Sequence, residues 1–491
     1  MQRSTCALTT LCAVFILTLC STVPLHAHHI KKGSSSELPV TTSSPKARAL
    51  YEKGMADYEN LYLERCNDDW RAAVKEDPKL ALAWAWIAFN SGNPTEVSTA
   101  RNNAKALVPT LTAGEQLMVG WIIKVQEGDY ISGISLMNDM LEMYPSDKHL
   151  LYLAANWLMG ENGNEQAQRL LEKALVLDKD FPAALNDLAY VDARNREFAK
   201  AFAAMERYVA LLPEEPNPQD SYGELKRMAG EFDESLQHYR AALKIDPDFV
   251  TSQVGLGDTY ALMGKQEQAR AEYEKAIRSA HNEADRLSYR LQRAMTWVRE
   301  GKYTQADKDF ADIAQAAHMK EQDLQEAQAF RHMAEYQGDN KLALMDLKLA
   351  EDVLHEHNMI SVLDRDEELS RILRNRAVCA SRAGEQSLAS QSLQRLQALA
   401  AGSRNRVIQS SYYGAAGTLL MDQRKFEDAI ISLEEDQDNP FTMELLVQAY
   451  YQTGQPEKLH EIEQKLRGTN LPTMEQALVV LPVRTQLPAM E

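Results

Sequence analysis

Apolar residues in the middle of the chain recur at helical spacing, and glycine interrupts them at regular intervals. Val254, Leu256 and Tyr260 place one apolar stripe on the stretch that begins near residue 250, and Gly264 ends it. A second stripe follows over residues 269–277, with steps of four, three and one. Such steps are typical of an α-helix with one buried face, and a glycine just beyond them is typical of a helix end. The pattern therefore predicts two helices joined by a tight turn.

This two-helix unit repeats along the chain at a fixed interval of 34 residues. Glycine, tyrosine and alanine return at the same distance in the pairs Gly223 and Gly257, Gly230 and Gly264, Tyr239 and Tyr273, and Ala242 and Ala276. A fixed period of this length indicates a solenoid, in which each unit packs only on its neighbours. Units are expected to begin near residues 47, 81, 114, 148, 182, 216 and 250, and less regular ones near 287, 324, 370, 410 and 440. We expect the extra residues of the later units to lie in loops between units, the longest near His355 to Glu368, where they form either an added helical turn or a mobile loop.

The residues at fixed places in these units resemble the tetratricopeptide-repeat family, whose pattern has a Leu-Gly or Leu-Ala pair, a tyrosine, an alanine, an aromatic residue and a second alanine. The matching residues are Trp84, Ile87, Ala88 and Ala100 in one unit, and Leu256, Gly257, Tyr260, Ala269, Tyr273 and Ala276 in another. The resemblance implies an all-α fold, a right-handed superhelical solenoid of about twelve helix-turn-helix repeats. Residues 47–286 would form a regular array, residues 287–468 degenerate repeats, and residues 469–491 a C-terminal cap or tail.

In this family the first helix of each unit lines the concave side, so the face that it does not use for packing points at a ligand. In the early units that face is apolar and aromatic, with two asparagines whose amides suit a peptide backbone. The predicted groove residues are Tyr51, Met55, Tyr58, Phe89, Met118, Ile122, Tyr152, Asn156, Asn186 and Tyr190. The alternative is that these side chains pack between neighbouring helices as core. The lysine and asparagine clamp with which some family members hold a C-terminal carboxylate is absent, since Tyr152 stands at a lysine position.

The charge balance narrows the class of partner. The chain carries 53 basic and 71 acidic residues, for a net charge of −18. Because an acidic chain repels phosphate backbones, nucleic acid is not an expected partner. A composition of 45% hydrophobic and 25% charged residues is ordinary for a globular protein and argues against a disordered chain. A protein or peptide partner is expected, with no small-molecule cofactor.

Residues 1–27 have the features of an export signal. Arg3 supplies the positive start, an apolar stretch follows up to Cys20, and Ala27 offers a cleavage site. Residues 28–46 are rich in serine and threonine and predict a flexible spacer. The protein is therefore expected in the periplasm or outside the cell.

A second interpretation of the same segment is lipidation at Cys20, because residues 17–20 resemble a bacterial lipoprotein box. Leu19 departs from that pattern, in which a small residue precedes the cysteine. Lipidation would make the protein an outer-membrane lipoprotein, and membrane attachment is expected only in that case.

The sequence contains no phosphate-binding glycine loop, nucleophile elbow or dinucleotide fingerprint. His355 and His357 lack the spacing that places two zinc ligands on one helical face, so we interpret them as part of a solvated loop. We therefore expect no catalytic residues, no metal and no cofactor, and predict an exported, non-catalytic scaffold or adaptor that binds a peptide or helix in its concave groove. The alternatives are a lipid-anchored envelope assembly factor and an enzyme with its chemistry in the loop over residues 351–369.

Overall fold

The computed structural model describes residues 37–91, 93–160, 163–356 and 360–486, and every regular element within them is helical. The helices form successive antiparallel pairs. The first helices of the pairs are α1 (Pro45–Glu59), α3 (Ala81–Asn90), α5 (Ala113–Gln126), α7 (Lys148–Gly160), α9 (Pro182–Arg194), α11 (Pro216–Ala229), α13 (Val250–Leu262), α15 (Glu283–Arg299), α17 (Asp323–Tyr336), α19 (Val362–Arg382), α21 (Arg406–Asp422) and α23 (Pro440–Thr453).

Each of these first helices is followed by a second one. The second helices are α2 (Leu63–Glu76), α4 (Pro94–Leu107), α6 (Tyr130–Met143), α8 (Asn164–Leu177), α10 (Phe198–Leu211), α12 (Phe232–Ile245), α14 (Gln266–Ser279), α16 (Tyr303–Met319), α18 (Asn340–Glu356), α20 (Gln386–Gly402), α22 (Phe426–Leu433) and α24 (Pro456–Arg467). A π-helical turn, Gln476–Val480, and the short α25 (Leu481–Gln486) complete the described chain. The all-α repeat fold expected from the sequence is confirmed.

The turns of the regular pairs α11/α12 and α13/α14 are made as the glycine pattern predicted. Gly230 and Gly264 adopt positive φ angles of 86° and 79°, which side chains rarely accept. Close helix contacts also use glycine: a Cβ added at Gly257 would lie 2.6 Å from Cε1 of Tyr273, inside van der Waals contact. The small residue and the tyrosine therefore act together, since the ring fills the space that the missing side chain leaves.

The expected position of the extra residues in the later units is wrong. Helices α15, α16, α18, α20 and α21 each contain 17 residues and α19 contains 21, whereas α5 to α14 contain 13 or 14. The additions therefore lengthen helices instead of loops. In the expected loop over residues 351–369, α18 continues to Glu356 and α19 starts at Val362, where the side chain of Ser361 accepts a hydrogen bond from the backbone of Asp364. Residues 357–359 lie outside the described residues.

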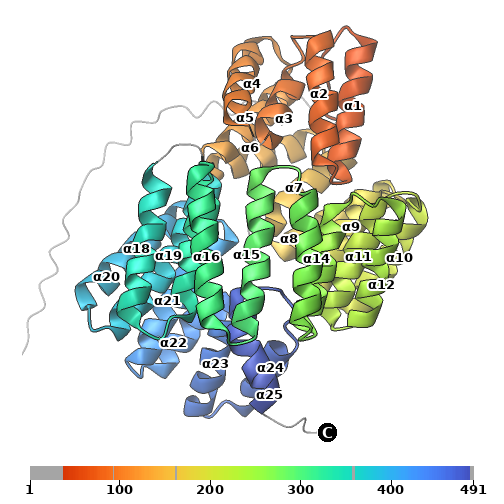
Figure 1. Ribbon diagram of the computed structural model, residues 1–491. Coiled ribbons are helices and arrows are strands. Elements are labelled where there is room, and N and C mark those ends of the chain that lie inside the picture. The colour runs from red at the N-terminus through yellow and green to blue at the C-terminus, as the bar shows by residue number, and fades with distance from the viewer. Residues whose placement is uncertain (1–36, 92, 161–162, 357–359, 487–491) are drawn as a thin grey trace, which may run out of the picture.

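The array curls until its two halves meet, as Figure 1 shows: α1 to α6 lie at the top, α9 to α14 on the right, α18 to α22 on the left, and α23 to α25 at the bottom. Leu363, at the start of α19, packs against the hydrophobic core of the first repeats. At the other end of the ring, Asn470 Nδ2 donates to the carbonyl of Met228 over 3.2 Å. Arg299 likewise donates to the carbonyl of Thr473 over 3.3 Å. These contacts join segments far apart in the sequence.

Both ends of the described chain are packed. The backbone N–H of Leu38 donates to Asp147 over 2.7 Å, and that of Thr41 donates to Glu115 over 2.6 Å. Residues 37–44, which fall inside the spacer predicted over 28–46, therefore lie fixed across the starts of α5 and α7. Near the C-terminus, Met474 and Val480 are buried against α15 and α23. The predicted signal over residues 1–27 lies outside the described residues.

Candidate protein-binding cavity

The closed superhelix surrounds a cavity with a volume of about 1790 Å³. One wall comes from the inner helices of the first repeats, including Phe89 of α3, Trp157 of α7 and Arg194 of α9. The facing wall comes from the late repeats, including Arg374 of α19 and Phe441 of α23. The cavity therefore exists only because segments far apart in the sequence face each other across the ring.

The wall from the early repeats is built on aromatic packing. The ring of Phe89 lies 5.6 Å from that of Trp86 and 5.8 Å from that of Trp121, and Trp121 lies 5.6 Å from Trp157. These centroid distances are in the range that aromatic pairs prefer. Because successive first helices contribute to the same row, the edges of Phe89 and Trp157 are held in place at the cavity surface by rings buried behind them.

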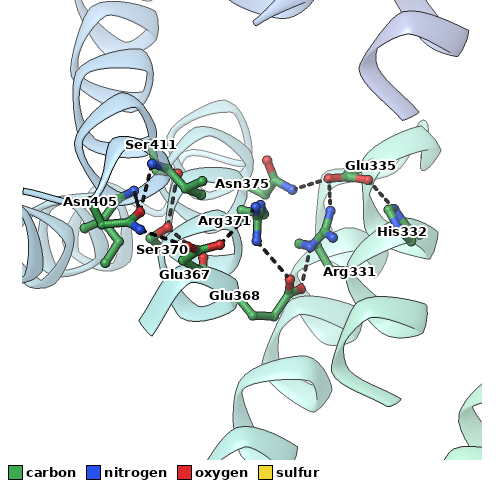
Figure 2. A network of polar contacts seen from close by, with 12 residues as sticks. Arg331, His332, Glu335, Glu367, Glu368, Ser370, Arg371, Asn375, Asn405 and Ser411 are labelled. Carbon is green, nitrogen blue, oxygen red and sulfur yellow. Dashed lines mark hydrogen bonds and ion pairs between the residues drawn. The ribbon is translucent and has the colours of Figure 1, made fainter. Parts of the chain in front are cut away.

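The wall from the late repeats is built on ion pairs (Figure 2). Arg331 of α17 contacts Glu335 over 2.6 Å and reaches Glu368 of α19 over 2.5 Å. Glu335 also accepts from Asn375 over 3.1 Å and contacts His332 over 2.8 Å. Burial alone would raise the pKa of Glu335, but the charges of Arg331 and His332 outweigh it and hold that pKa at about 2. The carboxylate is therefore ionised and structural at neutral pH.

Two further carboxylates of this wall are also paired. Asp436 contacts Arg374 over 2.8 Å. Asp438 is shared by two cations, Arg406 and Lys465, the second over 2.9 Å. These pairs connect α19, α21 and α24 to the turn before α23, so the polar wall is a rigid surface and not a set of independent side chains.

A smaller pocket of about 420 Å³ lies among the first repeats. Five of the predicted groove residues converge on it, namely Tyr51, Met55, Tyr58, Met118 and Tyr152. Residues 37–40 form one of its sides, and His149 with Asp147 lies at its polar edge. The first part of the predicted stripe thus forms a single aromatic concavity, partly covered by the N-terminal segment of the same chain.

The other predicted groove residues are divided. Phe89 and Asn156 line the large cavity, although the amide of Asn156 also donates to Asp187 over 2.9 Å. Ile122 is 0% exposed and Asn186 is 5% exposed, so both lie in the core. Tyr190 is half-buried, and its hydroxyl donates to Glu224 over 2.7 Å. The tight curvature also brings the first pair against the start of α11, where the hydroxyl of Tyr62 donates to Glu215.

The residues of the ionic wall, among them Arg371, Arg374, Asn405 and Arg406, were not predicted from the sequence. The one signal was Arg331, which stands where the repeat pattern expects a small residue. An arginine on a packing face indicates a buried carboxylate partner. Its partner Glu368 lies in the next repeat, inside the segment that was expected to be a loop.

The described residues carry neither a metal-binding cluster nor a membrane-spanning helix. No group of three or more histidine, cysteine, aspartate or glutamate side chains within them is arranged to hold a metal ion. None of the helices in the part of the chain that the structure describes is both long and apolar enough to cross a bilayer. Cys66 and Cys379 are not joined by a disulfide.

Two family profiles match the chain, one described as "Tetratricopeptide repeat" over residues 133–216 and one described as "TPR repeat" over residues 223–264. Among curated proteins, human "Protein O-mannosyl-transferase TMTC1" is 24% identical over 178 residues, which is 34% of this chain and 20% of that protein. The "TPR repeat-containing protein YpiA" of Bacillus subtilis is 24% identical over 152 residues, 30% of this chain and 36% of that protein. The chain therefore spans about a fifth of the length of the human relative and about a third of the length of the Bacillus one.

Among solved structures, a tetratricopeptide repeat protein from Parabacteroides merdae is 17% identical, and the similarity covers 55% of this chain and 93% of that one with a TM-score of 0.36. The profile matches fall on α6 to α13, where the repeat interval is most regular. Repeats of this kind generally mediate contacts between proteins, which supports a role as an interaction scaffold. The two profile matches identify tetratricopeptide repeats within residues 133–264, and the helical pairs on either side of that segment continue the same architecture.

Proposed function

We propose that this chain is an exported, non-catalytic adaptor that binds a peptide or helix of a partner protein in its central cavity. The observation that carries the proposal is the cavity itself. Its volume of about 1790 Å³ exceeds the roughly 300–1,000 Å³ of ordinary small-molecule sites, and a protein segment fills such a space better than a metabolite does.

The chemistry of the walls supports a polypeptide ligand. Phe89 and Trp157 offer rigid aromatic contacts, which are the side chains that most often dominate binding energy at protein interfaces. Asn156 and Asn375 on opposite walls carry amides that suit a peptide backbone. An apolar anchor on one side and polar groups on the other is the usual anatomy of a protein-binding groove.

The non-catalytic part of the proposal rests on how the polar groups are used. Glu335, Asp436 and Asp438 are each held by at least one cation, and these contacts join helices. Their chemistry is therefore committed to holding the wall together. The transferase activity in the name of the human relative belongs to a protein of which this chain matches 20%.

Export is proposed from residues 1–27 of the sequence, with the mature chain starting at His28. The second candidate, a lipid-anchored envelope assembly factor, depends on Cys20 becoming the mature N-terminus. Intact-mass analysis of protein extracted from the envelope separates the two. A mass that matches residues 28–491 supports the soluble adaptor, whereas a chain that starts at a lipid-modified Cys20 supports the anchored factor.

Gly160 offers a direct test of the cavity. It lines the cavity at the end of α7, and a Cβ built on it meets nothing within 4 Å. Gly160→Trp should therefore fill the space without disturbing the fold. The matched control is Val176→Trp on α8, where the residue is 84% exposed on the outside of the array.

The experiment is capture of binding partners from envelope extract by the parent chain and by both variants. We expect a protein that the parent and Val176→Trp retain and that Gly160→Trp loses, with circular dichroism unchanged in all three. Equal capture by Gly160→Trp would show that partners use another surface, and the proposed site would be wrong.

A further inference from the structure

The small pocket of about 420 Å³ among the first repeats differs from the central cavity in both size and lining. Its volume falls within the roughly 300–1,000 Å³ of ordinary small-molecule sites, a range that the central cavity exceeds. Helices α1, α3, α5 and α7 each contribute side chains to it, and residues 37–40 form one side. The function proposed for the central cavity makes no use of this pocket.

Aromatic rings form a large part of the pocket lining. Four aromatic residues from three helices take part, namely Tyr51, Tyr58, Trp86 and Tyr152. The ring centroids of Tyr58 and Trp86 lie 5.0 Å apart and their planes are inclined by 49°, so the two rings are not stacked flat on each other. The face of an aromatic ring is the negative part of its quadrupole and attracts a cation. Several such rings around one space are the common element of sites that bind organic ammonium groups.

The pocket also contains a buried polar group that lacks a hydrogen bond. Tyr152 is only 3% exposed, and its hydroxyl makes no hydrogen bond within the described residues. The hydroxyl of Tyr58 likewise has no hydrogen-bond partner in the part of the chain that the structure describes. Burial raises the pKa of both hydroxyls, so both are neutral at physiological pH. A ligand that donates to these oxygens removes the cost of leaving a buried polar group unpaired.

The charges around the pocket are mainly negative. Two groups that can carry positive charge line it, Arg48 and His149, against four carboxylates, those of Glu37, Glu52, Glu59 and Asp147. An excess of negative charge therefore remains even when His149 is protonated. The electrostatic interactions that act most strongly on the hydroxyls of Tyr51, Tyr58 and Tyr152 all raise their pKa, and Glu59 contributes to each of them.

The two groups that can be positive already have partners. Arg48 donates to the carbonyl of Val40 over 2.6 Å and lies 3.8 Å from the carboxylate of Glu52. His149 contacts Glu59 over 2.5 Å. Neither group is left to hold an anion, and an anion would also meet the remaining carboxylates. The lining therefore favours a cation over an anion.

We propose that this pocket binds a small organic cation, a primary ammonium group joined to an apolar body, held by the aromatic rings of the lining and by the hydroxyl of Tyr152. The ammonium group lies near Glu59 and donates to the tyrosine oxygen. The apolar body contacts Met55 and Met118, whose flexible side chains adapt to its shape. This site is distinct from the central cavity and does not rest on the function proposed for it.

The test compares three probes of similar size that differ in charge: benzylammonium, benzyl alcohol and benzoate. Binding of each probe to residues 28–491 is measured by isothermal titration calorimetry. We expect benzylammonium to bind at least about tenfold more tightly than benzyl alcohol, and benzoate to bind most weakly. Equal or tighter binding of the alcohol or of benzoate would overturn the proposal.

Three substitutions at Ala56 separate charge from space. Ala56 lines the pocket and is exposed, so a longer side chain there has room. For benzylammonium we expect Ala56→Lys to bind roughly tenfold more weakly than Ala56→Gln, and Ala56→Glu to bind at least as tightly as Ala56→Gln. Circular dichroism checks that all three variants are folded. Equal binding by the three would show that the pocket does not select charge, and the inference would fail.

The tyrosine hydroxyl is tested with a matched control. Tyr152→Phe keeps the ring and should weaken binding of benzylammonium by roughly tenfold, which corresponds to one hydrogen bond to a charged group. Tyr451→Phe removes a hydroxyl from α23 outside the pocket, where the residue is 73% exposed, and should change binding by less than about twofold. Equal affinities of the parent and both variants would show that the acidic exterior of a chain with a net charge of −18 holds the cation, which would overturn the site.

An ammonium group of this kind comes either from a free amine or from a lysine side chain of a protein. A short peptide with one lysine is therefore compared with the same peptide carrying norleucine, which has a similar apolar stem and no charge. Tighter binding of the lysine peptide than of benzylammonium would identify a protein as the source, and the reverse order a free amine. Equal binding of the lysine and norleucine peptides, together with no preference for benzylammonium over benzyl alcohol, would contradict a cation site.

Discussion

The early and the late repeats share one architecture but are stabilised differently. In the early repeats Trp70, Trp86 and Trp121 are buried, and the rings of Trp70 and Trp86 stack 5.7 Å apart. In the late repeats the equivalent interior contains charged residues such as Arg331, and Glu368, which is 0% exposed. The same helical pairs can therefore be joined by apolar rings or by buried ion pairs.

The two regions also differ in the residues at their helix contacts. Pairs in the regular array have 13 or 14 residues per helix and keep the small residues that allow close approach, such as Gly257. In the late repeats, arginines on the 14-residue α17 and the 21-residue α19 reach carboxylates on neighbouring helices. Apolar packing accepts small shifts, whereas a buried ion pair fixes one alignment because a displaced charge stays unpaired. The polar wall of the cavity is thus the more rigid of the two.

The largest expected effect is in the ionic wall. Arg331→Met should destabilise the late repeats by about 3–5 kcal/mol, because Glu335 and Glu368 would remain buried without their common cation. Urea unfolding gives the loss, and hydrogen exchange should place it on α17 to α19 with α1 to α6 still protected. The exposed pair of Arg169 provides the control, since Arg169→Met should change stability by less than about 1 kcal/mol. Equal losses from both variants would contradict the comparison.

The next effect depends on pH and distinguishes the ionic wall from the middle of the array. Burial raises the pKa of Asp220 to about 7 against the opposing effects of the Ser252 hydroxyl and the Arg227 charge, whereas that of Glu335 is held at about 2. A raised carboxyl pKa adds stability below its unfolded value near 4, and that stability is lost as the pH rises towards 7. A carboxyl pKa that folding lowers adds stability above a pH of about 4.5, and that stability is lost as the pH falls towards 2.

Asp220→Asn should therefore stabilise the protein by about 2 kcal/mol or more at pH 8 and by much less at pH 4. Glu335→Gln should destabilise it at pH 7, and this loss should shrink as the pH falls below 4.5. Thermal unfolding of the parent and both variants across this pH range gives the result. Parallel curves for the parent and Asp220→Asn would show that this carboxyl titrates normally in the folded chain.

A smaller effect is expected when the apolar wall is changed conservatively. Trp121→Phe should cost about 1–2 kcal/mol, because the substitution keeps an aromatic ring and removes an indole N–H that has no hydrogen-bond partner among the described residues. Calorimetric unfolding measures the change. A loss as large as that of Arg331→Met would mean that both walls need an equally specific fit.

The smallest effect concerns Gly160. Gly160→Ala should leave stability unchanged or raise it by up to about 1 kcal/mol, because alanine favours the helix and its Cβ enters open space. Gly257→Ala, which would contact Tyr273, should cost about 1–3 kcal/mol. Destabilisation by Gly160→Ala would show that the cavity is narrower at this point than its lining residues indicate.

The repeats themselves could be predicted from the sequence because the signal is local and periodic. Predicted starts at 81, 148, 182, 216, 250 and 440 coincide with the first residues of helices, and those at 287 and 410 are four residues late. The prediction at 370 falls eight residues inside α19, because its first turns are charged and resemble a loop. Helical spacing alone does not distinguish a polar loop from a polar helix that pairs with buried arginines.

The site could be predicted only in part. Tyr51, Tyr58 and Tyr152 were named together and do converge on one pocket, since their positions follow from the repeat. The cavity depends on curvature accumulated over many repeats, and no local pattern encodes that Phe89 and Phe441 line the same space from opposite sides of the ring. The burial of Ile122 also depends on this curvature. The closeness of neighbouring first helices decides which side of the row of predicted groove residues is covered.

The central claim, that a partner protein enters the cavity, is tested most directly by photo-cross-linking in the living cell. A photo-reactive phenylalanine derivative is placed at position 160 inside the cavity or at position 176 on the exposed outer face of α8. The account predicts a discrete cross-linked partner from position 160 that is absent from position 176. The same partner from position 176 alone, or from both positions equally, would contradict it.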